Sequence, residues 1–167
     1  AGASCLLVFP PNSMSMGGQL RPEMAQAHLE TIAAATDLPL ILFQYPAASG
    51  LGYPFETLIS LLESIPSIVA IKDWCADHML HEKHSRSLPN LARPVTVLTT
   101  HSAWLMSSLV MGAGGLLSGA GSVIADLQTR LIDSWIAVGV RHLYAFSRCR
   151  TVAKGPPVRC YRTVCIG

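Results

Sequence analysis

Lys72 is the side chain in this sequence whose surroundings most favour covalent chemistry. It closes the apolar run SIVAIK (67–72) and is followed by Asp73 and Trp74. An amine at the end of a buried strand is desolvated, and desolvation favours its neutral form, which attacks carbonyl carbons. The alternative is a structural lysine whose stem lies on apolar surface while its ammonium pairs with Asp73 or with a loop carboxylate.

A tyrosine near the end of a neighbouring apolar run could move protons for such a lysine. The run LPLILFQY (38–45) ends in Phe43, Gln44 and Tyr45. Because side chains alternate along a strand, Phe43 and Tyr45 share one face and Gln44 takes the other. A phenol beside a Schiff-base lysine can relay protons. The alternative is a packed aromatic ring whose hydroxyl meets water or a carbonyl.

The histidines are weaker candidates for chemistry. His101 could act as an acid or base, or it could cap the helix expected immediately after it. We expect the histidines of the helical segments to be solvated on polar faces; these are His28, His78, His81 and His84. Although His81 and His84 are three residues apart, no third ligand is evident, so we expect no metal site.

The cysteines and glycines indicate neither a disulfide framework nor a cofactor site. Five cysteines without C-x-x-C spacing fit a disulfide framework or a zinc site poorly. We expect Cys5 and Cys75 to be ordinary buried or half-buried thiols in a reducing, cytoplasmic setting. The segment GAGGLLSGAG (112–121) flanks an apolar run instead of opening a helix after one, so it is a weak dinucleotide fingerprint. We expect no cofactor.

Five apolar, β-rich runs alternate with helical patterns along the chain. The apolar runs are SCLLVF (4–9), LPLILFQY (38–45), SIVAIK (67–72), PVTVLTT (94–100) and GGLLSG (114–119). The helical patterns cover residues 22–36, 54–65, 76–88, 102–112 and 122–138. The runs are continuous in hydrophobicity, which is typical of strands that are buried on both faces, as in a parallel sheet covered by helices.

This order predicts an α/β protein with parallel strands and about five βα units. Two architectures remain open, namely a doubly wound sheet and part of a (β/α)8 TIM barrel. In both, active groups lie at the carboxyl ends of strands, which is where Lys72 stands. The apolar runs are all too short for a membrane helix, which needs roughly 18 consecutive apolar residues.

Charge divides the chain at about residue 138. Residues 1–138 hold six Lys and Arg and all ten Asp and Glu, whereas residues 139–167 hold six Lys and Arg and no acid. We therefore expect one domain over 1–138 and a divergent basic tail over 139–167, disordered or translated in another reading frame. A basic segment can also bind nucleic acid, so a nucleic-acid-binding module is an alternative, less expected, function.

Five segments, in order, resemble the dihydrodipicolinate synthase / N-acetylneuraminate lyase family of class I Schiff-base aldolases and dehydratases. They are AGASCLLVFPP, DLPLILFQYPAASG, IPSIVAIKDW, VLTTHSA and GAGGLLSGAGSVIADL. The resemblance implies a (β/α)8 barrel that acts on pyruvate or another 2-keto acid, without a cofactor and as a homo-oligomer when full-length. It implies that Lys72 forms the imine and that a tyrosine moves protons, a part that Tyr45 would take in this sequence.

The resemblance also implies which residues would line the pocket. These are Phe43, Thr99, Thr100, Leu117 and Ser118, all at strand ends.

The sequence departs from the family pattern at several of these strand ends. Phe43 stands where the family has the proton-relaying tyrosine, and Tyr45 follows two residues later. Ala48 stands where dihydrodipicolinate synthases carry an arginine for the second substrate's carboxylate, and PPNS replaces an aromatic PPYY. These changes predict a different aldehyde or sugar-acid substrate.

The resemblance begins at the family's fourth strand, so residues 1–138 correspond to the C-terminal portion of the barrel. Five of eight units cannot close a barrel. We therefore keep a second hypothesis of another class, a catalytically inactive truncated fragment or a module that works only in association with other chains.

Overall fold

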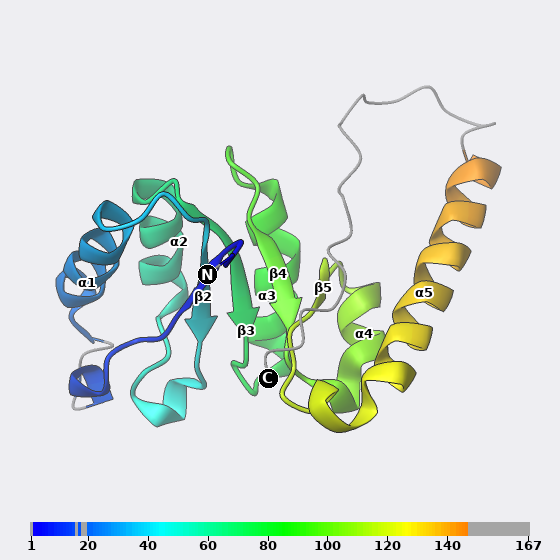
Figure 1. The fold of residues 1–167 in the computed structure, drawn as a ribbon, viewed down its shortest axis with the longest axis horizontal. Helices are drawn as coiled ribbons and strands as arrows, with labels where there is room; N and C mark the ends of the chain where they lie inside the picture. Colours follow the sequence, from blue (N-terminus) through cyan, green and yellow to red (C-terminus); the bar gives the residue numbers. More distant parts are fainter. Residues whose placement is uncertain (1, 16, 18–19, 147–167) are drawn as a thin grey trace.

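Strands and helices alternate strictly along the part of the chain that the structure describes (Figure 1). The computed structural model describes residues 2–15, 17 and 20–146, with side chains described as far as Val138. The strands are β1 (Leu6–Val8), β2 (Leu40–Gln44), β3 (Ile68–Asp73), β4 (Thr96–Thr99) and β5 (Gly115–Leu116). The helices are α1 (Pro22–Ala34), α2 (Phe55–Ser64), α3 (His78–Ser87), α4 (Leu105–Val110) and α5 (Gly121–Phe146).

The five strands form one parallel sheet whose spatial order equals the chain order, β1-β2-β3-β4-β5. This confirms the prediction of an α/β fold with parallel strands. A doubly wound sheet reverses its strand order at a switch point. The described strands contain no such reversal, so their order is that of consecutive units in a (β/α)8 barrel.

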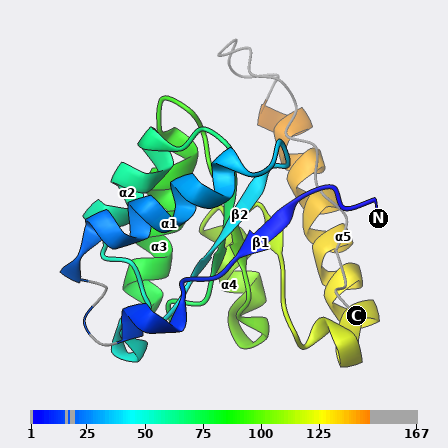
Figure 2. The ribbon, with the colours of Figure 1, turned by 60° about the vertical axis from the view of Figure 1, so that its left-hand side comes forward.

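One side of the sheet packs against helices. Leu42, Ile71 and Val97 occupy matching positions on β2, β3 and β4 and are almost completely buried. They form one core with Leu29 of α1 and Leu58 of α2. The helices α1, α2 and α3 lie on this side of the sheet in both views (Figures 1 and 2). Each fully buried Leu or Ile contributes about 1.5–3 kcal/mol, so this layer holds the strands in register.

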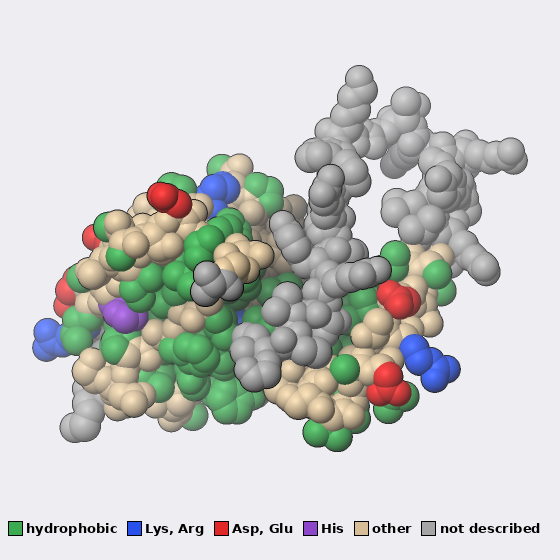
Figure 3. Space-filling view, in the orientation of Figure 1, with side chains coloured by type: hydrophobic (Ala, Val, Ile, Leu, Met, Phe, Trp, Pro, Cys, Tyr) green, Lys and Arg blue, Asp and Glu red, His purple; other side chains and the backbone are tan. Residues whose placement is uncertain are grey.

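The opposite side, which we call the open face, carries the other half of the strand side chains. Side chains alternate along each strand, so the residues next to the helix-facing ones point to this side. They include Ile41, Phe43, Lys72 and Leu98, of which Phe43, Lys72 and Leu98 pair in register. Ile41, Lys72 and Leu98 are only half-buried. The space-filling view shows hydrophobic side chains gathered over the strand region of the molecule (Figure 3).

Val69 is an extra residue in β3. Leu40 pairs with Ile68 and Ile41 pairs with Ala70, so Val69 has no partner on β2. Its side chain is 43% exposed, whereas Ile68 and Ile71 on either side are fully buried. Such a bulge shifts the alternation of a strand by one residue. It therefore decides that Ile68 and Ile71 both face the helices while Lys72 faces away.

The helices differ from the sequence predictions mainly at their ends. The helix expected over 102–112 is divided into a 3-10 turn, Ser102–Trp104, and the short helix α4. Helix α5 bends at Ile124 and continues to Phe146, beyond the expected 122–138. The division into a domain over 1–138 and a tail over 139–167 stays a prediction, and residues 147–167 lie outside the described part.

No helix in the described part of the chain is both long and apolar enough to cross a membrane.

Candidate functional site

Lys72 extends from β3 over the open face, one residue before that strand ends. It is paired in register with Phe43 on β2 and Leu98 on β4. Its Nζ atom lies 4.7 Å from the centre of the Phe43 ring. Burial among these side chains lowers the pKa of Lys72 from its ordinary value, because the charged form loses hydration. The amine is therefore more readily neutral than a surface lysine.

Four aromatic rings from three strand ends gather beside Lys72. The Phe43 ring lies 4.9 Å from Phe9, 4.4 Å from Tyr45 and 6.2 Å from Trp74, between ring centres. Tyr45 and Trp74 are 5.7 Å apart. Phe43 is nearly buried, whereas Phe9 and Trp74 are 48% and 42% exposed. The lysine thus stands beside an apolar aromatic wall, and within the described residues it forms no ion pair with a carboxylate.

The position of Tyr45 is set by the turn that follows β2. Gln44, on the helix-facing side, donates from Nε2 to the carbonyl of Tyr53 and accepts from the Tyr53 N–H. Gly52 approaches so closely that a Cβ atom there would lie 2.5 Å from the Tyr45 carbonyl oxygen. The turn is therefore tightly closed, and it brings the Tyr45 ring against Phe43, the ring that Lys72 contacts.

The residues expected to line the pocket are not all on the side of Lys72. Thr99 pairs in register with Asp73 and is fully buried on the helix-facing side. Its hydroxyl accepts from the His101 N–H and from Ser108. The expectation that Thr99 lines the pocket therefore disagrees with the structure, because side chains alternate and Lys72 takes the opposite face.

Thr100, Leu117 and Ser118 lie at the same carboxyl edge of the sheet as Lys72. The Thr100 N–H donates to the Asp73 carbonyl, and the Leu117 N–H donates to the Thr99 carbonyl. The Ser118 hydroxyl lies 2.9 Å from that of Ser102 and accepts from the Ala120 N–H. Their role in binding stays a prediction.

Asp73, the residue after Lys72, points to the helix-facing side and is fully buried there. Its Oδ2 atom lies 2.8 Å from Nδ1 of both His81 and His84, which are themselves fully buried. Its Oδ1 atom accepts from the Cys75 N–H. Burial alone would raise the pKa of Asp73, but the hydrogen bonds from His81 and His84 outweigh it and hold that pKa well below its usual range.

The prediction that His81 and His84 are solvated is therefore wrong. Residues three apart share one face of a helix, and this face of α3 packs against β3. The structural alternative in which Asp73 pairs with Lys72 is also wrong, because its described partners are the two histidines. His78 is exposed, as expected, and His28 is half-buried with its Nε2 atom 3.2 Å from the Phe9 carbonyl.

Cys75 is buried next to Asp73, as expected for an ordinary thiol. Its Sγ atom donates to the Asp77 carbonyl at 3.2 Å. Burial and the neighbouring Asp73 carboxylate both raise the pKa of this thiol. Cys5, by contrast, is half-buried just before β1.

His101 is buried between aromatic rings at the end of β4. It stacks on Trp104 at 3.9 Å and meets His81 edge-on at 5.9 Å, between ring centres. It makes no side-chain cap to the following turn, so the capping alternative is wrong. Burial lowers the pKa of His101, which favours the neutral ring.

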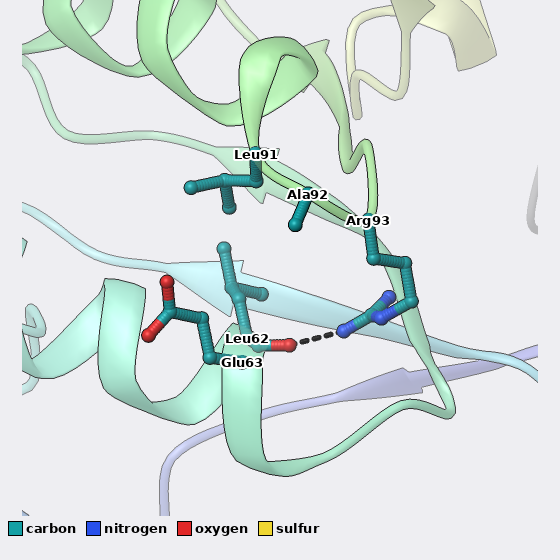
Figure 4. A pocket seen from close by; sticks show the side chains of 5 residues that line it. All are labelled: Leu62, Glu63, Leu91, Ala92 and Arg93. Carbon is teal, nitrogen blue, oxygen red and sulfur yellow. Dashed lines mark hydrogen bonds between the residues drawn. The ribbon is translucent and has the colours of Figure 1, made fainter.

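A separate pocket of about 230 Å³ lies at the other edge of the sheet, before the strands begin. It is lined by Leu62, Glu63, Leu91, Ala92 and Arg93 (Figure 4). Arg93 donates to the carbonyls of Leu62, Ile65 and Ile68, which closes the end of α2. This guanidinium thus serves the fold, and the pocket is remote from Lys72.

The sequence interpretation missed the group formed by Asp73, Cys75, His81 and His84. We call these four residues the Asp73 cluster. The signal was present as the spacing D-x-C-x5-H-x2-H over residues 73–84. Spacing alone does not show that Asp73 faces the helix-facing side of β3, where both histidines meet it.

Comparison with known proteins is consistent with this arrangement of strands. The dihydrodipicolinate synthetase family pattern matches residues 1–142. The 4-hydroxy-tetrahydrodipicolinate synthase of Symbiobacterium thermophilum is 30% identical over 121 residues, covering 72% of this chain and 40% of that protein. The enzyme of the same name from Dehalococcoides mccartyi is 30% identical over 145 residues, covering 87% of this chain and 46% of that protein.

Solved structures share the fold. YagE, a prophage protein of the dihydrodipicolinic acid synthase family from E. coli K12, was solved in complex with pyruvate; it superposes with a TM-score of 0.73 at 20% identity. That match covers 88% of this chain and 48% of YagE. The dihydrodipicolinate synthase of Aquifex aeolicus superposes with a TM-score of 0.68 at 21% identity over 88% of this chain and 49% of that one. The chain spans less than half the length of the relatives it matches.

Proposed function

Because this chain belongs to the dihydrodipicolinate synthetase family, we propose that Lys72 forms a Schiff base with pyruvate or another 2-keto acid in a lyase reaction. The observation that carries the proposal is the placement of Lys72 at the carboxyl end of β3, on the open face, with a lowered pKa. YagE, whose structure was solved with pyruvate, supports the choice of keto acid.

The chemistry follows from a neutral amine beside apolar rings. Lys72 attacks the C2 carbonyl, water leaves, and a protonated imine forms. This cation withdraws electrons, so that a proton is lost from C3 to give an enamine, or a C3–C4 bond breaks. The enamine carbon can then add to an aldehyde in the reverse sense. Tyr45, whose ring lies against Phe43 beside the lysine, is the proposed group for moving these protons.

The pocket proposed for the keto acid lies over Lys72 at the carboxyl edge of the sheet. Phe43 forms one wall, and Thr100, Leu117 and Ser118 stand at the neighbouring strand ends. The arginine that would hold a second carboxylate is absent, since Ala48 occupies that position and is exposed. The proposal is therefore a Schiff-base lyase whose second substrate differs from that of the 4-hydroxy-tetrahydrodipicolinate synthases.

Borohydride trapping tests this proposal directly. The full-length protein that contains this chain is treated with pyruvate and borohydride, digested, and mapped by mass spectrometry. We expect a reduced pyruvyl adduct on the peptide containing Lys72 and its loss in Lys72→Arg. Lys83, an exposed lysine of α3 whose Nζ lies 3.6 Å from the Phe55 ring, is the internal control and should stay unmodified. Absence of the adduct at Lys72 contradicts the proposal.

The second candidate, a module that works only in association with other chains, is favoured by a different observation. The open face exposes apolar side chains, including Phe9 at 48% and Val69 at 43%. Circular dichroism and size-exclusion chromatography of the 167-residue chain separate the candidates. A compact, cooperative monomer with lyase activity contradicts the second one.

A further inference from the structure

The Asp73 cluster brings four metal-binding side chains together on the side of the sheet away from Lys72. Asp73 ends β3, Cys75 follows it, and His81 and His84 lie on the inner face of α3. The exposed fraction is 0% for Asp73, His81 and His84 and 3% for Cys75. One ligand atom each from Asp73, Cys75 and His84 lies within 4.8 Å of the other two.

We propose that the Asp73 cluster is a binding site for a divalent transition metal of the zinc class, with Asp73, Cys75 and His84 as ligands and His81 as the fourth. The proposal does not depend on the Schiff-base chemistry, because the cluster and Lys72 lie on opposite sides of β3.

The ligand set matches what zinc selects. Zinc takes carboxylate oxygen, imidazole nitrogen and thiolate sulfur, with four ligands in a tetrahedron. Bond lengths of about 2.0–2.3 Å place neighbouring ligand atoms roughly 3.3–3.8 Å apart. Both Nδ1 atoms are already 2.8 Å from Asp73 Oδ2. Binding would open the two histidine hydrogen bonds to admit the ion.

Charge also fits a dication. Binding deprotonates the Cys75 thiol and releases that proton to solvent, while the imidazoles bind as neutral groups. One thiolate and one carboxylate then balance two positive charges.

Hydrogen-bonding groups behind His81 are placed to hold its ring in position. Its Nε2 atom lies 2.9 Å from the Ser108 hydroxyl, which donates to Thr99 Oγ1 at 3.2 Å. A metal-bound imidazole usually donates its other N–H to an oxygen, which fixes the ring. With His81 bound through Nδ1, Nε2–H donates to Ser108, and Ser108 passes its own hydrogen on to Thr99. In the structure Ser108 is indeed the donor and Thr99 the acceptor of the hydrogen bond between them.

Cobalt binding provides the test, provided that the other thiols are removed from the measurement. Cys149, Cys160 and Cys165 are therefore changed to serine together, and this triple variant is stripped with a chelator and titrated with Co²⁺. We expect about one equivalent bound, intense visible bands typical of tetrahedral Co²⁺, and a near-ultraviolet thiolate-to-cobalt charge-transfer band.

Cys75→Ser in that background should abolish the charge-transfer band, whereas Cys5→Ser, at the half-buried thiol before β1, should leave it unchanged. If Cys75→Ser does not fold, zinc X-ray absorption of the triple variant decides the question without it, by showing one sulfur and three nitrogen or oxygen neighbours. Failure of the triple variant to bind Co²⁺, a charge-transfer band that survives Cys75→Ser, or a zinc shell without sulfur would overturn the proposal.

Discussion

At the scale of single residues, Lys72 and Asp73 are adjacent in sequence and opposite in environment. Lys72 meets aromatic rings on the open face, and Asp73 meets two imidazoles on the helix-facing side. Burial acts on both charged forms, so it lowers the pKa of the lysine and by itself would raise that of the aspartate. Only the aspartate has partners that reverse the effect.

The lowered pKa of Lys72 predicts how adduct formation depends on pH. The amine must be neutral to attack, so the rate of pyruvate trapping should rise through a midpoint below about 10.4, the ordinary lysine value. Phe43→Ala admits water and should move that midpoint upward, because the desolvation lost exceeds the cation–π attraction lost. A midpoint unchanged in Phe43→Ala, measured by trapping rate against pH, would show that the ring does not set it.

Tyr45 is expected to act after the imine has formed. In the full-length protein, Tyr45→Phe should keep the borohydride adduct on Lys72 and lower turnover by about 10²-fold, the smaller end of general acid–base contributions. The same substitution at the buried Tyr53 is the control, since that ring is packed in the core cluster. Equal turnover in wild type and Tyr45→Phe would remove Tyr45 from the mechanism.

Asp73 makes the stability of the folded chain depend on pH in the acid range. Because its pKa is lower in the folded chain than in the unfolded one, the stability it contributes is present above the ordinary carboxyl pKa of about 3.9. That stability is lost as the pH falls below this value toward the lowered pKa. Asp73→Asn should cost about 3–5 kcal/mol at neutral pH, because it breaks a buried charged network. Urea unfolding should show the difference from wild type shrinking in acid.

At the scale of elements, helix α3 holds the Asp73 cluster in place and begins at a defined cap. The Asp77 carboxylate accepts from the Met79 and Leu80 N–H groups at 2.9 and 3.1 Å. These N–H groups have no partner within the helix, so the cap satisfies them. The short β3–α3 connection carries Cys75 between the strand and this cap.

Removal of the cap gives a small, local loss of stability. Asp77→Ala should lower the free energy of unfolding by about 1 kcal/mol, as measured by chemical denaturation. Asp126→Ala, at an exposed position inside α5, is the matched control and should change stability by less than about 0.5 kcal/mol. Equal effects of the two substitutions would mean that Asp77 does not cap α3 in solution.

At the scale of the whole molecule, the sheet is covered on one side by helices and exposes apolar side chains on the other. In closed barrels the inner face is filled by side chains from all strands, in layers. Here Val69 and Trp74, on β3 and directly after it, are 43% and 42% exposed. A surface of this kind favours association.

We therefore expect the isolated 167-residue chain to sediment as species heavier than its 17.9 kDa mass. Val69→Lys should shift the distribution toward the monomer without changing the circular dichroism spectrum, since Val69 lies at a bulge and is not packed in the core. Val110→Lys, at a position of α4 that is 61% exposed, is the control and should leave association unchanged. Sedimentation velocity that finds only monomers before any substitution would contradict this expectation.

Much of the fold follows from local pattern. Long apolar runs cannot be solvated, and their alternation with helical segments leaves few arrangements other than a parallel sheet with helical crossovers. For the same reason the place of Lys72 near the carboxyl end of a strand was predictable, because a lysine that ends such a run must lie where the strand emerges. Its role in chemistry stays a prediction.

What only the tertiary structure decided is which side each residue faces and which distant side chains meet. The bulge at Val69 arises from the pairing of β3 with β2. It shifts by one residue the alternation of β3 side chains between the helix-facing side and the open face. The register of β4 on β3 places Thr99 with Asp73 and not with Lys72. The histidines His81 and His84, expected at a solvent face, meet a buried carboxylate. Sequence determines period and composition, whereas register and burial are set by packing between elements far apart in the chain.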